Sequence, residues 1–357
     1  MRILVDATPL LLRSAGVKTY TYHWIQHLLE QAGNEQILTF PRISKLAALN
    51  HERSMLGGMR TMSHLALVLA ANGVPGLSNW GMPSADVLHV STLIRNPPRN
   101  IKLTATVHDM TCRLMPELHT PANRKADESF TKHILQRAAR LIAVSESTKA
   151  DAVRLAGLEP ERIEVIYSGV PEVYFGAQPR PAERPYILFV GTIEPRKNID
   201  TLLDAWQSCR ARGDFDLVIA GASGWAGDKT SARLLAKPRG VRYLGYVPED
   251  ELPGLTAGAS AFVYPSLYEG FGFPVAQAMA AGVPVITSNT SCLPEVAGEG
   301  ALFVDPHSAA EIQHAMDKLL ASPSLQQKLR TAGMARARQE YRWSICARKS
   351  LEFFRSA

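Results

Sequence analysis

Short runs of β-branched and other apolar residues alternate along the chain with longer segments of helical periodicity. This alternation is typical of parallel sheets whose strands are connected by helices. In the first half, the predicted strands are residues 3–5, 87–90, 103–107, 141–144 and 163–166. In the second half, they are residues 186–190, 217–220, 241–244, 261–264, 283–287 and 301–304. The pattern predicts an α/β fold in two successive parts.

A segment rich in proline separates the two series of strands. Residues 176–185 hold three prolines in ten positions, which is typical of an interdomain linker. We therefore expect two Rossmann-like domains, residues 1–175 and 176–340, that face each other across a cleft at the carboxyl ends of their strands. A last helical pattern begins at Trp343, and its apolar face needs a partner. Residues 341–357 are expected to pack back on the first domain.

The stretch 266–274 lies between an apolar strand and a run of small residues that starts a helix. Its two glycines allow the backbone to approach a ligand closely, and Pro274 suits the first position of a helix. Free amide groups at a helix start favour phosphate. Because Glu269 lies beside them, a ligand with both phosphate and hydroxyl groups, such as a nucleotide sugar, fits better than phosphate alone.

A second polar loop follows the predicted strand 186–190 and carries Arg196 and Lys197. Cations in such a strand-to-helix loop can neutralise a pyrophosphate as negative charge develops on the leaving group. For two adjacent cations alone, a solvated basic turn is the alternative interpretation. The presence of the 266–274 loop in the same half favours the phosphate site.

Taken together, several motifs resemble the retaining glycosyltransferases of family four, which have the GT-B fold. They are residues 15–20, 107–109, 144–146, 191–198, 264–274, 281–288 and 293–298. The resemblance covers nearly the whole chain, and the 191–198 loop looks like that of bacterial mannosyltransferases of surface polysaccharide assembly. It implies sugar transfer from a nucleotide donor with retention at the anomeric carbon.

The resemblance also implies a role for each matching residue. Arg196 and Lys197 would bind the donor pyrophosphate, Glu269 the hydroxyls of the transferred sugar, and His108 would lie over that sugar near the reacting carbon. For His108, a hydrogen-bonded histidine that holds a loop is the alternative. The implied catalytic residues are His108, Glu269, Arg196 and Lys197. The implied donor-binding residues are Gly16, Gly191, Thr192, Arg196, Lys197, Gly270, Phe271, Gly272, Phe273 and Gln277.

Two positions depart from the family pattern. Gln277 occupies the place of a second glutamate that holds the nucleotide ribose in the family, and Thr192 occupies the place of a frequent arginine. A neutral hydrogen bond from Gln277 contributes about 0.5–1.5 kcal/mol, against roughly 1.5–3 kcal/mol for a charge-assisted one. Weaker donor binding, or a nucleotide held differently, is expected.

No metal or cofactor is expected at this site. Asp214 and Asp216 have the spacing of a metal-binding pair, but they lead into a strand at the end away from the cleft. No Gly-x-Gly-x-x-Gly follows the first strand, which disfavours a nicotinamide dehydrogenase. The glycines of the 221–224 segment indicate either close approach to the nucleotide or a tight turn. The four cysteines are widely separated, which disfavours a zinc site or a disulfide framework.

The basic residues concentrate in one region, with seven Lys/Arg and two acids between residues 41 and 102. The region contains Arg42, Lys45, Arg53, Arg60, Arg95, Arg99 and Lys102. Peripheral contact with a membrane that carries a lipid-pyrophosphate acceptor and a merely solvated basic face are equally compatible with it. Nucleic acid is disfavoured because the region has no interleaved aromatics and no recognisable binding motif.

The composition is that of a soluble globular protein, with 46% hydrophobic and 20% charged residues in 357. The sequence shows no signal peptide and no run of eighteen apolar residues, so a cytoplasmic protein is expected, alone or on the inner face of the membrane. The donor is expected to be GDP-mannose and the acceptor a glycan or polyprenyl-linked sugar. The alternatives are a nucleotide-sugar-binding protein without turnover and a GT-B phosphorylase or epimerase.

Overall fold

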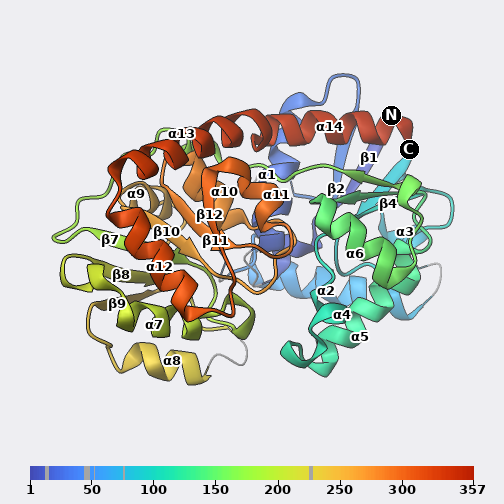
Figure 1. Ribbon diagram of the computed structural model, residues 1–357. Helices are drawn as coiled ribbons and strands as arrows, with labels where there is room; N and C mark the ends of the chain where they lie inside the picture. Colours follow the sequence, from blue (N-terminus) through green and yellow to red (C-terminus); the bar gives the residue numbers. More distant parts are fainter. Residues whose placement is uncertain (13–15, 44–48, 52, 75–76, 225–227) are drawn as a thin grey trace. The chain divides into compact units, whose positions relative to one another are not determined.

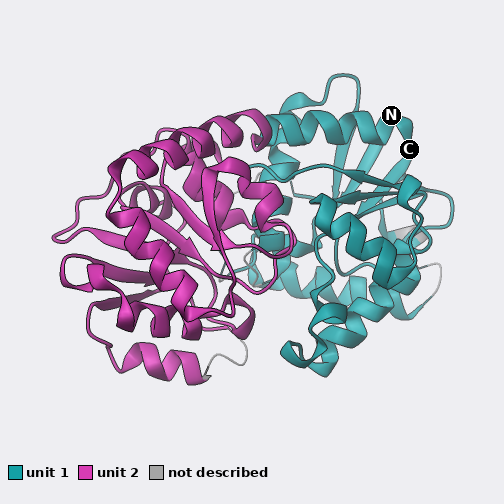
Figure 2. Ribbon diagram, in the orientation of Figure 1, with its two compact units in different colours: residues 1–169, 343–357 teal, residues 170–342 magenta. Residues whose placement is uncertain are grey.

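The computed structural model describes residues 1–12, 16–43, 49–51, 53–74, 77–224 and 228–357 (Figure 1). The chain divides into two compact units (Figure 2). Unit 1 consists of Met1–Gly169 and Trp343–Ala357, and unit 2 consists of Val170–Arg342. The division falls before the proline-rich segment 176–185 because the residues ahead of it are bound to unit 2. The amide of Val170, for example, donates to the carbonyl of Tyr341 at 2.7 Å.

Unit 1 contains a six-stranded parallel sheet in the order β2-β1-β3-β4-β5-β6. The strands are β1 (Arg2–Asp6), β2 (Gln36–Phe40), β3 (Val87–Val90), β4 (Lys102–Val107), β5 (Arg140–Ala143) and β6 (Ile163–Val165). Strand β3 is buried along its whole length, as expected of a central parallel strand covered on both faces.

Helices connect the strands of unit 1. They are α1 (Gly16–Gln31), α2 (Gly58–Gly73), α3 (Ser78–Gly81), α4 (Thr111–Leu114), α5 (Pro121–Phe130) and α6 (Glu146–Ala156). A further helix of unit 1, α14 (Trp343–Ser356), follows unit 2 along the chain. Short 3₁₀ turns are η1 (Thr8–Leu11), η2 (Pro116–Leu118) and η4 (Pro160–Arg162), and η3 (Thr131–Leu135) is a π-helical turn. Helix α6 shows why such segments begin and end where they do. The Ser145 hydroxyl accepts from the amide of Thr148, and Gly157 ends the helix with a left-handed φ of 62°.

The last helix, α14, packs against the first helix, α1, within unit 1. Trp24 donates its indole N–H to the Ser350 hydroxyl at 2.9 Å, and both side chains are buried. The rings of Tyr20 and Trp343 meet edge to face, 5.5 Å apart. A Cβ on Gly169 would lie 2.4 Å from the Trp343 ring, so only glycine fits there. The two ends of the chain therefore share one core.

Unit 2 contains a second six-stranded parallel sheet in the order β12-β11-β10-β7-β8-β9. Its strands are β7 (Tyr186–Val190), β8 (Asp216–Ala220), β9 (Val241–Gly245), β10 (Ala261–Tyr264), β11 (Val285–Ser288) and β12 (Ala301–Val304). Its helices are α7 (Ile199–Ser208), α8 (Asp228–Leu235), α9 (Leu252–Ala257), α10 (Phe273–Ala280), α11 (Leu293–Ala297), α12 (Ala309–Leu320) and α13 (Pro323–Glu340). Short turns are η5 (Glu172–Tyr174), η6 (Pro195–Lys197), η7 (Arg210–Gly213) and η8 (Gly298–Gly300).

The strand order of unit 2 reverses at β7. The chain passes from β7 to β8 on one side, and β10 pairs with β7 on the other side. In open parallel sheets, ligands bind beyond the carboxyl ends of the strands at such a reversal. A ligand-binding site is therefore expected at the loops that follow β7 and β10.

The predicted α/β fold is confirmed, and each predicted strand is present within one or two residues. The strand expected at 283–287 is β11, which begins at Val285, because Pro284 has no amide for the ladder. Strand β2 and helix α2 were not predicted. Across the described ranges, no helix is both long enough and apolar enough to cross a bilayer.

Candidate functional site

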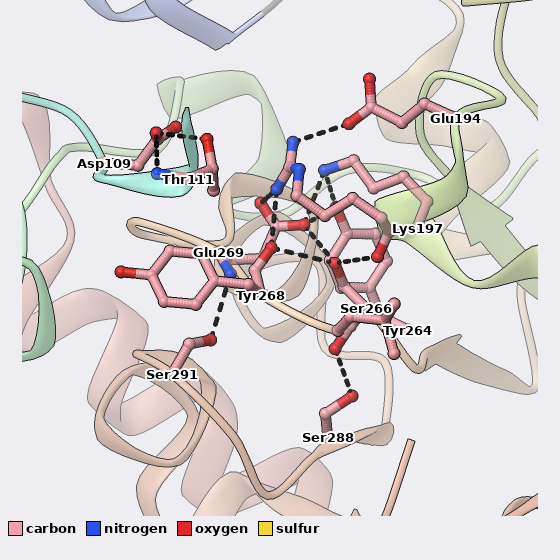
Figure 3. A network of polar contacts seen from close by, with 12 residues as sticks. Asp109, Thr111, Glu194, Lys197, Tyr264, Ser266, Tyr268, Glu269, Ser288 and Ser291 are labelled. Atoms are coloured by element: carbon pink, nitrogen blue, oxygen red, sulfur yellow. Dashed lines mark hydrogen bonds and ion pairs between the residues drawn. The ribbon is translucent and has the colours of Figure 1, made fainter. Parts of the chain in front are cut away.

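The loops after β7 and β10 are bound to each other in unit 2 (Figure 3). The amide of Leu267 donates to the Arg196 carbonyl at 2.9 Å, and the Ser266 hydroxyl donates to the same carbonyl at 3.1 Å. The Asn198 amide group donates to the carbonyls of Pro265 and Pro306, at 3.0 and 2.6 Å. Asn198 has a left-handed φ of 58°, which asparagine tolerates better than most residues. These bonds fix the turn that carries Arg196 and Lys197.

Lys197 lies buried beside the carboxylate of Glu269. Its Nζ donates to Glu269 Oε1 at 2.6 Å and to the hydroxyl of Tyr264 at 2.7 Å. The same carboxylate oxygen accepts from Tyr264 at 3.0 Å and from Ser266 at 2.7 Å. Figure 3 shows these side chains converging from both loops. The sequence placed Lys197 and Glu269 in one pocket, and the structure brings them into direct contact.

Arg196 binds the other oxygen of the same carboxylate. Its NH1 lies 2.9 Å from Glu269 Oε2, and its NH2 donates to Glu194 Oε1 at 2.7 Å. A third bond runs to the carbonyl of Tyr268 at 2.7 Å. Glu194, Arg196, Lys197 and Glu269 form a buried ion-pair cluster with two positive and two negative groups. The cations that the sequence assigned to a pyrophosphate are thus already paired with carboxylates.

The charges in the ion-pair cluster shift its protonation equilibria. Burial by itself would raise the pKa of Glu269, but the positive charges of Arg196 and Lys197 outweigh it and lower that pKa to about 2. Burial lowers the pKa of Lys197, and the neighbouring Arg196 adds to this effect. Glu269 is therefore ionised throughout the neutral range. It can accept hydrogen bonds from sugar hydroxyls, and the cations beside it can stabilise a phosphate.

Helix α10 begins at Phe273, shortly after Glu269. Its N-cap, Gly272, has a φ of 82°, and a Cβ there would lie 2.8 Å from Leu293. The helix starts at Phe273, so Pro274 occupies the second position rather than the expected first one. The Phe271 ring is buried, 5.2 Å from that of Phe273. Because the Phe271 side chain is buried, its backbone is the part that can contact a ligand. Gln277 lies further along α10 and is half-buried.

Gly191 and Thr192 begin the loop after β7, and this loop packs on the loop after β8. The amide of Ile193 donates to the Ala222 carbonyl at 2.9 Å. A Cβ on Gly221 would lie 1.9 Å from the Gly191 carbonyl oxygen, and one on Gly224 would lie 2.5 Å from Thr192 Cγ2. Because residues 221 and 224 are glycines, the loop that carries Arg196 can pack closely on the loop after β8. The sequence had indicated either close approach to the nucleotide or a tight turn for residues 221–224. Neither interpretation included this contact between the two loops.

The remaining candidates, Gly16 and His108, belong to unit 1. Gly16 is the exposed first residue of α1. Apart from its chain neighbours and the backbone of its own helix, no described residue has an atom within 4 Å of the position of its missing Cβ. His108 follows β4, and its ring meets Tyr20 edge to face at 4.9 Å. Its Nε2 is inaccessible to solvent and has no hydrogen-bond partner among the described residues. Burial lowers the pKa of His108 to about 4, so the ring is neutral at pH 7.

The loop after β4 is held by Asp109. The Asp109 carboxylate accepts from the amide of Thr111 at 3.0 Å and from its hydroxyl at 2.6 Å (Figure 3). Such a turn needs no contribution from His108.

Three residues of the site were missed by the sequence reasoning. Glu194 pairs with Arg196, and Tyr264 and Ser266 hold the Glu269 carboxylate. Tyr264 is the last residue of β10, and Ser266 follows shortly after it. The sequence signal that could have identified Tyr264 and Ser266 is the presence of polar side chains at the carboxyl end of a buried strand.

The basic region of unit 1 is only partly available for a partner. The Arg95 guanidinium donates to the carbonyls of Thr92, Ile94 and Ala126, so this residue does not belong to an open basic face. Lys102 donates to the carbonyl of the terminal residue, Ala357. Lys45 lies outside the described residues. The exposed arginines of the region are Arg42, Arg53, Arg60 and Arg99.

Comparisons with known proteins agree with this geometry. The family described as "Glycosyl transferases group 1" matches residues 172–336, and "Glycosyltransferase Family 4" matches residues 14–174. The O-antigen chain mannosyltransferase B of Escherichia coli is 33% identical over 273 residues, which cover 72% of this chain and 71% of that protein.

Solved structures show the same fold. Sucrose-phosphate synthase from Thermosynechococcus elongatus superposes with a TM-score of 0.75 at 20% identity, over 100% of this chain and 98% of the other. HepE of Anabaena, in complex with UDP-glucose, superposes with a TM-score of 0.72 at 17% identity over 100% of both chains. With two matching family profiles, a similar mannosyltransferase and two parallel-sheet units, the chain belongs to the GT-B glycosyltransferases of group 1 and family 4.

Proposed function

We propose that the protein transfers mannose from GDP-mannose to a hydroxyl of a glycan or polyprenyl-linked acceptor, with retention at the anomeric carbon, during synthesis of a cell-surface polysaccharide. The observation that carries the proposal is the buried ion-pair cluster at the start of α10. The choice of mannose is supported by the similarity to an O-antigen mannosyltransferase.

In the proposed reaction, the acceptor oxygen attacks the anomeric carbon while the bond from that carbon to the phosphate oxygen breaks. The departing phosphate oxygen takes the acceptor proton on the same face of the sugar, which gives retention without a carboxylate nucleophile. Arg196 and Lys197 stabilise the negative charge that develops on the phosphate. Glu269 accepts from the hydroxyls of the sugar and thereby orients it.

The paired state of the cations adds a step to this scheme. A pyrophosphate that reaches the ion-pair cluster competes with Glu194 for Arg196 and with Glu269 for Lys197. Glu269, once partly released, gains capacity to accept from sugar hydroxyls. Donor binding and the orientation of the sugar are then coupled through one carboxylate.

We further propose that fixed cations and helix-start amides suffice for the reaction, so that no divalent metal is required. The acceptor would bind to unit 1, where His108 is the candidate to lie over the donor sugar. Its neutral ring can donate one hydrogen bond and accept another, but it carries no charge at pH 7. Contact with the inner face of a membrane through the basic region 42–102 is part of the proposal.

The test is an assay of nucleotide release with GDP-mannose and a panel of other nucleotide sugars, with and without a mannosyl acceptor and with excess EDTA. We expect acceptor-dependent release of GDP, a glycoside product with an α-linkage, and no loss with EDTA. Arg196→Ala and Lys197→Ala should each lower kcat by about a hundredfold or more. Arg233→Ala is the matched control, because Arg233 pairs with Asp200 and Asp204 elsewhere in unit 2.

The same assay separates the alternatives. Donor binding without acceptor-dependent release would identify a binding protein without turnover. Release of a sugar phosphate or of an epimerised nucleotide sugar would identify a phosphorylase or an epimerase. Loss of turnover with EDTA, or full turnover in Arg196→Ala/Lys197→Ala, would overturn the proposed mechanism.

A further inference from the structure

Helix α2 of unit 1, whose ribbon is labelled in Figure 1, is partly apolar. Apolar side chains are exposed along one of its faces. Met59 is 89% exposed, Met62 73% and Leu69 71%, and Val74, just beyond the helix, is 56% exposed. These are four of the ten large apolar residues that are exposed in the described chain, yet they fall within sixteen positions. Such clustering marks an interaction surface, whereas single exposed apolar residues are ordinary.

The spacing of these residues places them on one stripe. Positions three and four apart lie on the same side of a helix, which aligns Met59, Met62 and Leu69 with the small residues between them. The outer face of α2 is defined by its exposed residues, Gly58, Met59, Arg60, Met62, Ser63, Ala66, Leu69, Ala70 and Gly73. A helix that is apolar on both sides is normally buried on both, and here only one side is covered by the protein.

The opposite side of α2 is fixed to unit 1. Val68 is buried in the core of the unit. Asn72 donates to the Leu93 carbonyl at 2.8 Å and accepts from the Arg95 amide at 2.7 Å. At the other end, Thr61 donates to the Leu56 carbonyl at 3.0 Å. The helix therefore cannot roll its apolar stripe inward, and the outer face of α2 remains available to a partner.

The charged residues in the sequence around α2 are mostly positive. From residue 36 to residue 85 the sequence contains four Lys/Arg and one acid, Glu52. Arg60 is on the helix itself, and Arg42 and Arg53 are exposed in the segment before it. An apolar helix face with flanking cations is the combination that lies in the interface of an anionic bilayer.

We propose that the outer face of α2 inserts into the surface of an anionic bilayer, with Arg42, Arg53 and Arg60 at the level of the lipid headgroups. This deepens the proposed function, on which it rests for a lipid-linked acceptor, by identifying the surface that brings unit 1 to that acceptor. A protein partner is less favoured, because the outer face of α2 contains no tryptophan and no tyrosine, and binding hot spots are rich in both.

The proposal is tested by co-sedimentation of the full chain with vesicles of phosphatidylcholine alone and with about one third phosphatidylglycerol, at low salt and in 1 M salt. The wild type is expected to bind the anionic vesicles and to be weakened by salt. Met62→Ser/Leu69→Ser should lower the partition coefficient at least about tenfold. Each removed cation in Arg42→Gln/Arg53→Gln/Arg60→Gln should lower it about fivefold.

The matched control is Leu235→Ser in unit 2. Leu235 is 70% exposed, against 71% for Leu69, and it lies at the end of α8, so its replacement should leave vesicle binding unchanged. All these side chains are exposed, and the thermal midpoints of the variants should match that of the wild type.

Two results would overturn the proposal. One is that Met62→Ser/Leu69→Ser binds the vesicles to the same extent as the wild type, whether both bind or neither does. The other is a wild-type dimer in light scattering that this variant converts to a monomer, since a second copy would then cover the face. GDP release with a water-soluble acceptor, measured on the same variants, is independent of α2. Failure of the glycosyltransferase proposal is thereby distinguished from failure of the membrane proposal.

Discussion

Lys197 Nζ lies 2.6 Å from Glu269 Oε1, and the two side chains are only 10% and 9% exposed. A pair of opposite charges at this depth is costly to desolvate, and its members depend on each other and on Arg196 for compensation. The stability of unit 2 and the chemistry of the site are therefore tied to the same contact.

Lys197→Met should destabilise the protein measurably. Removal of one member of a buried pair costs roughly 3–5 kcal/mol when the other charge is left alone, but Arg196 still compensates Glu269 here, so a loss of about 2 kcal/mol is expected. Urea unfolding measures it. Arg233→Met, which breaks a more exposed pair, should cost under about 1 kcal/mol. Equal losses in the two variants would contradict the coupling.

Gln277→Glu should tighten donor binding while turnover is kept. If Gln277 contacts the nucleotide ribose, a charge-assisted bond replaces a neutral one, and the difference of about 1 kcal/mol corresponds to roughly fivefold in Kd. Calorimetric titration with GDP-mannose measures the change. Gln327→Glu on α13 adds the same charge at an exposed position of unit 2 and should not alter Kd. Weaker binding in Gln277→Glu would count against this placement of the ribose.

The stability of the protein should fall as the pH drops below 6.5. Burial lowers the pKa of His108 to about 4 and that of His89 to about 3, whereas an unfolded histidine titrates near 6.5. Between the folded and the unfolded pKa of each histidine, the unfolded chain binds a proton that the folded chain excludes. Each histidine therefore reduces the free energy of unfolding by up to about 1.4 kcal/mol for each unit by which the pH falls.

His89→Gln provides the check on this pH dependence. His89 lies between the hydroxyls of Thr104 and Thr106, at 2.9 and 2.8 Å, and glutamine keeps the capacity to bond there. The slope of unfolding free energy against pH, measured from pH 6.5 to 4, should become shallower by about 1.4 kcal/mol per unit. A slope identical to that of the wild type would show that His89 titrates normally.

Gly221→Ala should destabilise unit 2 and impair donor binding together. The new methyl would lie 1.9 Å from the Gly191 carbonyl oxygen, so the Arg196-bearing loop must shift, at a cost of about 3 kcal/mol or more. Gly213→Ala is the control, because among the described residues only its chain neighbours and the backbone of its own helical turn could lie within 4 Å of the added methyl. Thermal unfolding and titration with GDP-mannose measure both effects. Unchanged donor affinity in Gly221→Ala would separate this packing from the site.

Most of the fold could be predicted because buried parallel strands are continuous apolar runs, as in Leu-Val-Ile-Ala before Gly221. Strand β2 was missed because it is an edge strand with an exposed start, so its sequence lacks that signature. Helix α2 was missed for a related reason. Its apolar residues face both the core and the solvent, which removes the periodicity by which a helix is recognised.

At the site, the sequence indicated which residues meet but not their state of charge. The loops containing Arg196 and Glu269 are recognisable because glycine and proline positions signal a strand, a turn and a helix start. The charge of Arg196 is compensated by Glu194, two residues earlier in the chain. This contact depends on the side-chain conformations, which no rule of sequence spacing predicts. The polar support from Tyr264 and Ser266 likewise depends on the exact end of β10.

The joining of α14 to α1 in unit 1 has a consequence for the order in which the protein matures. Trp24 and Tyr20 find their final neighbours among residues 343–354. Before residues 343–354 are synthesised, Trp24 and Tyr20 lack these neighbours, so the amino-terminal half can complete its packing only after unit 2 has been made. A change in residues 343–354 therefore acts on the half of the enzyme that was synthesised first.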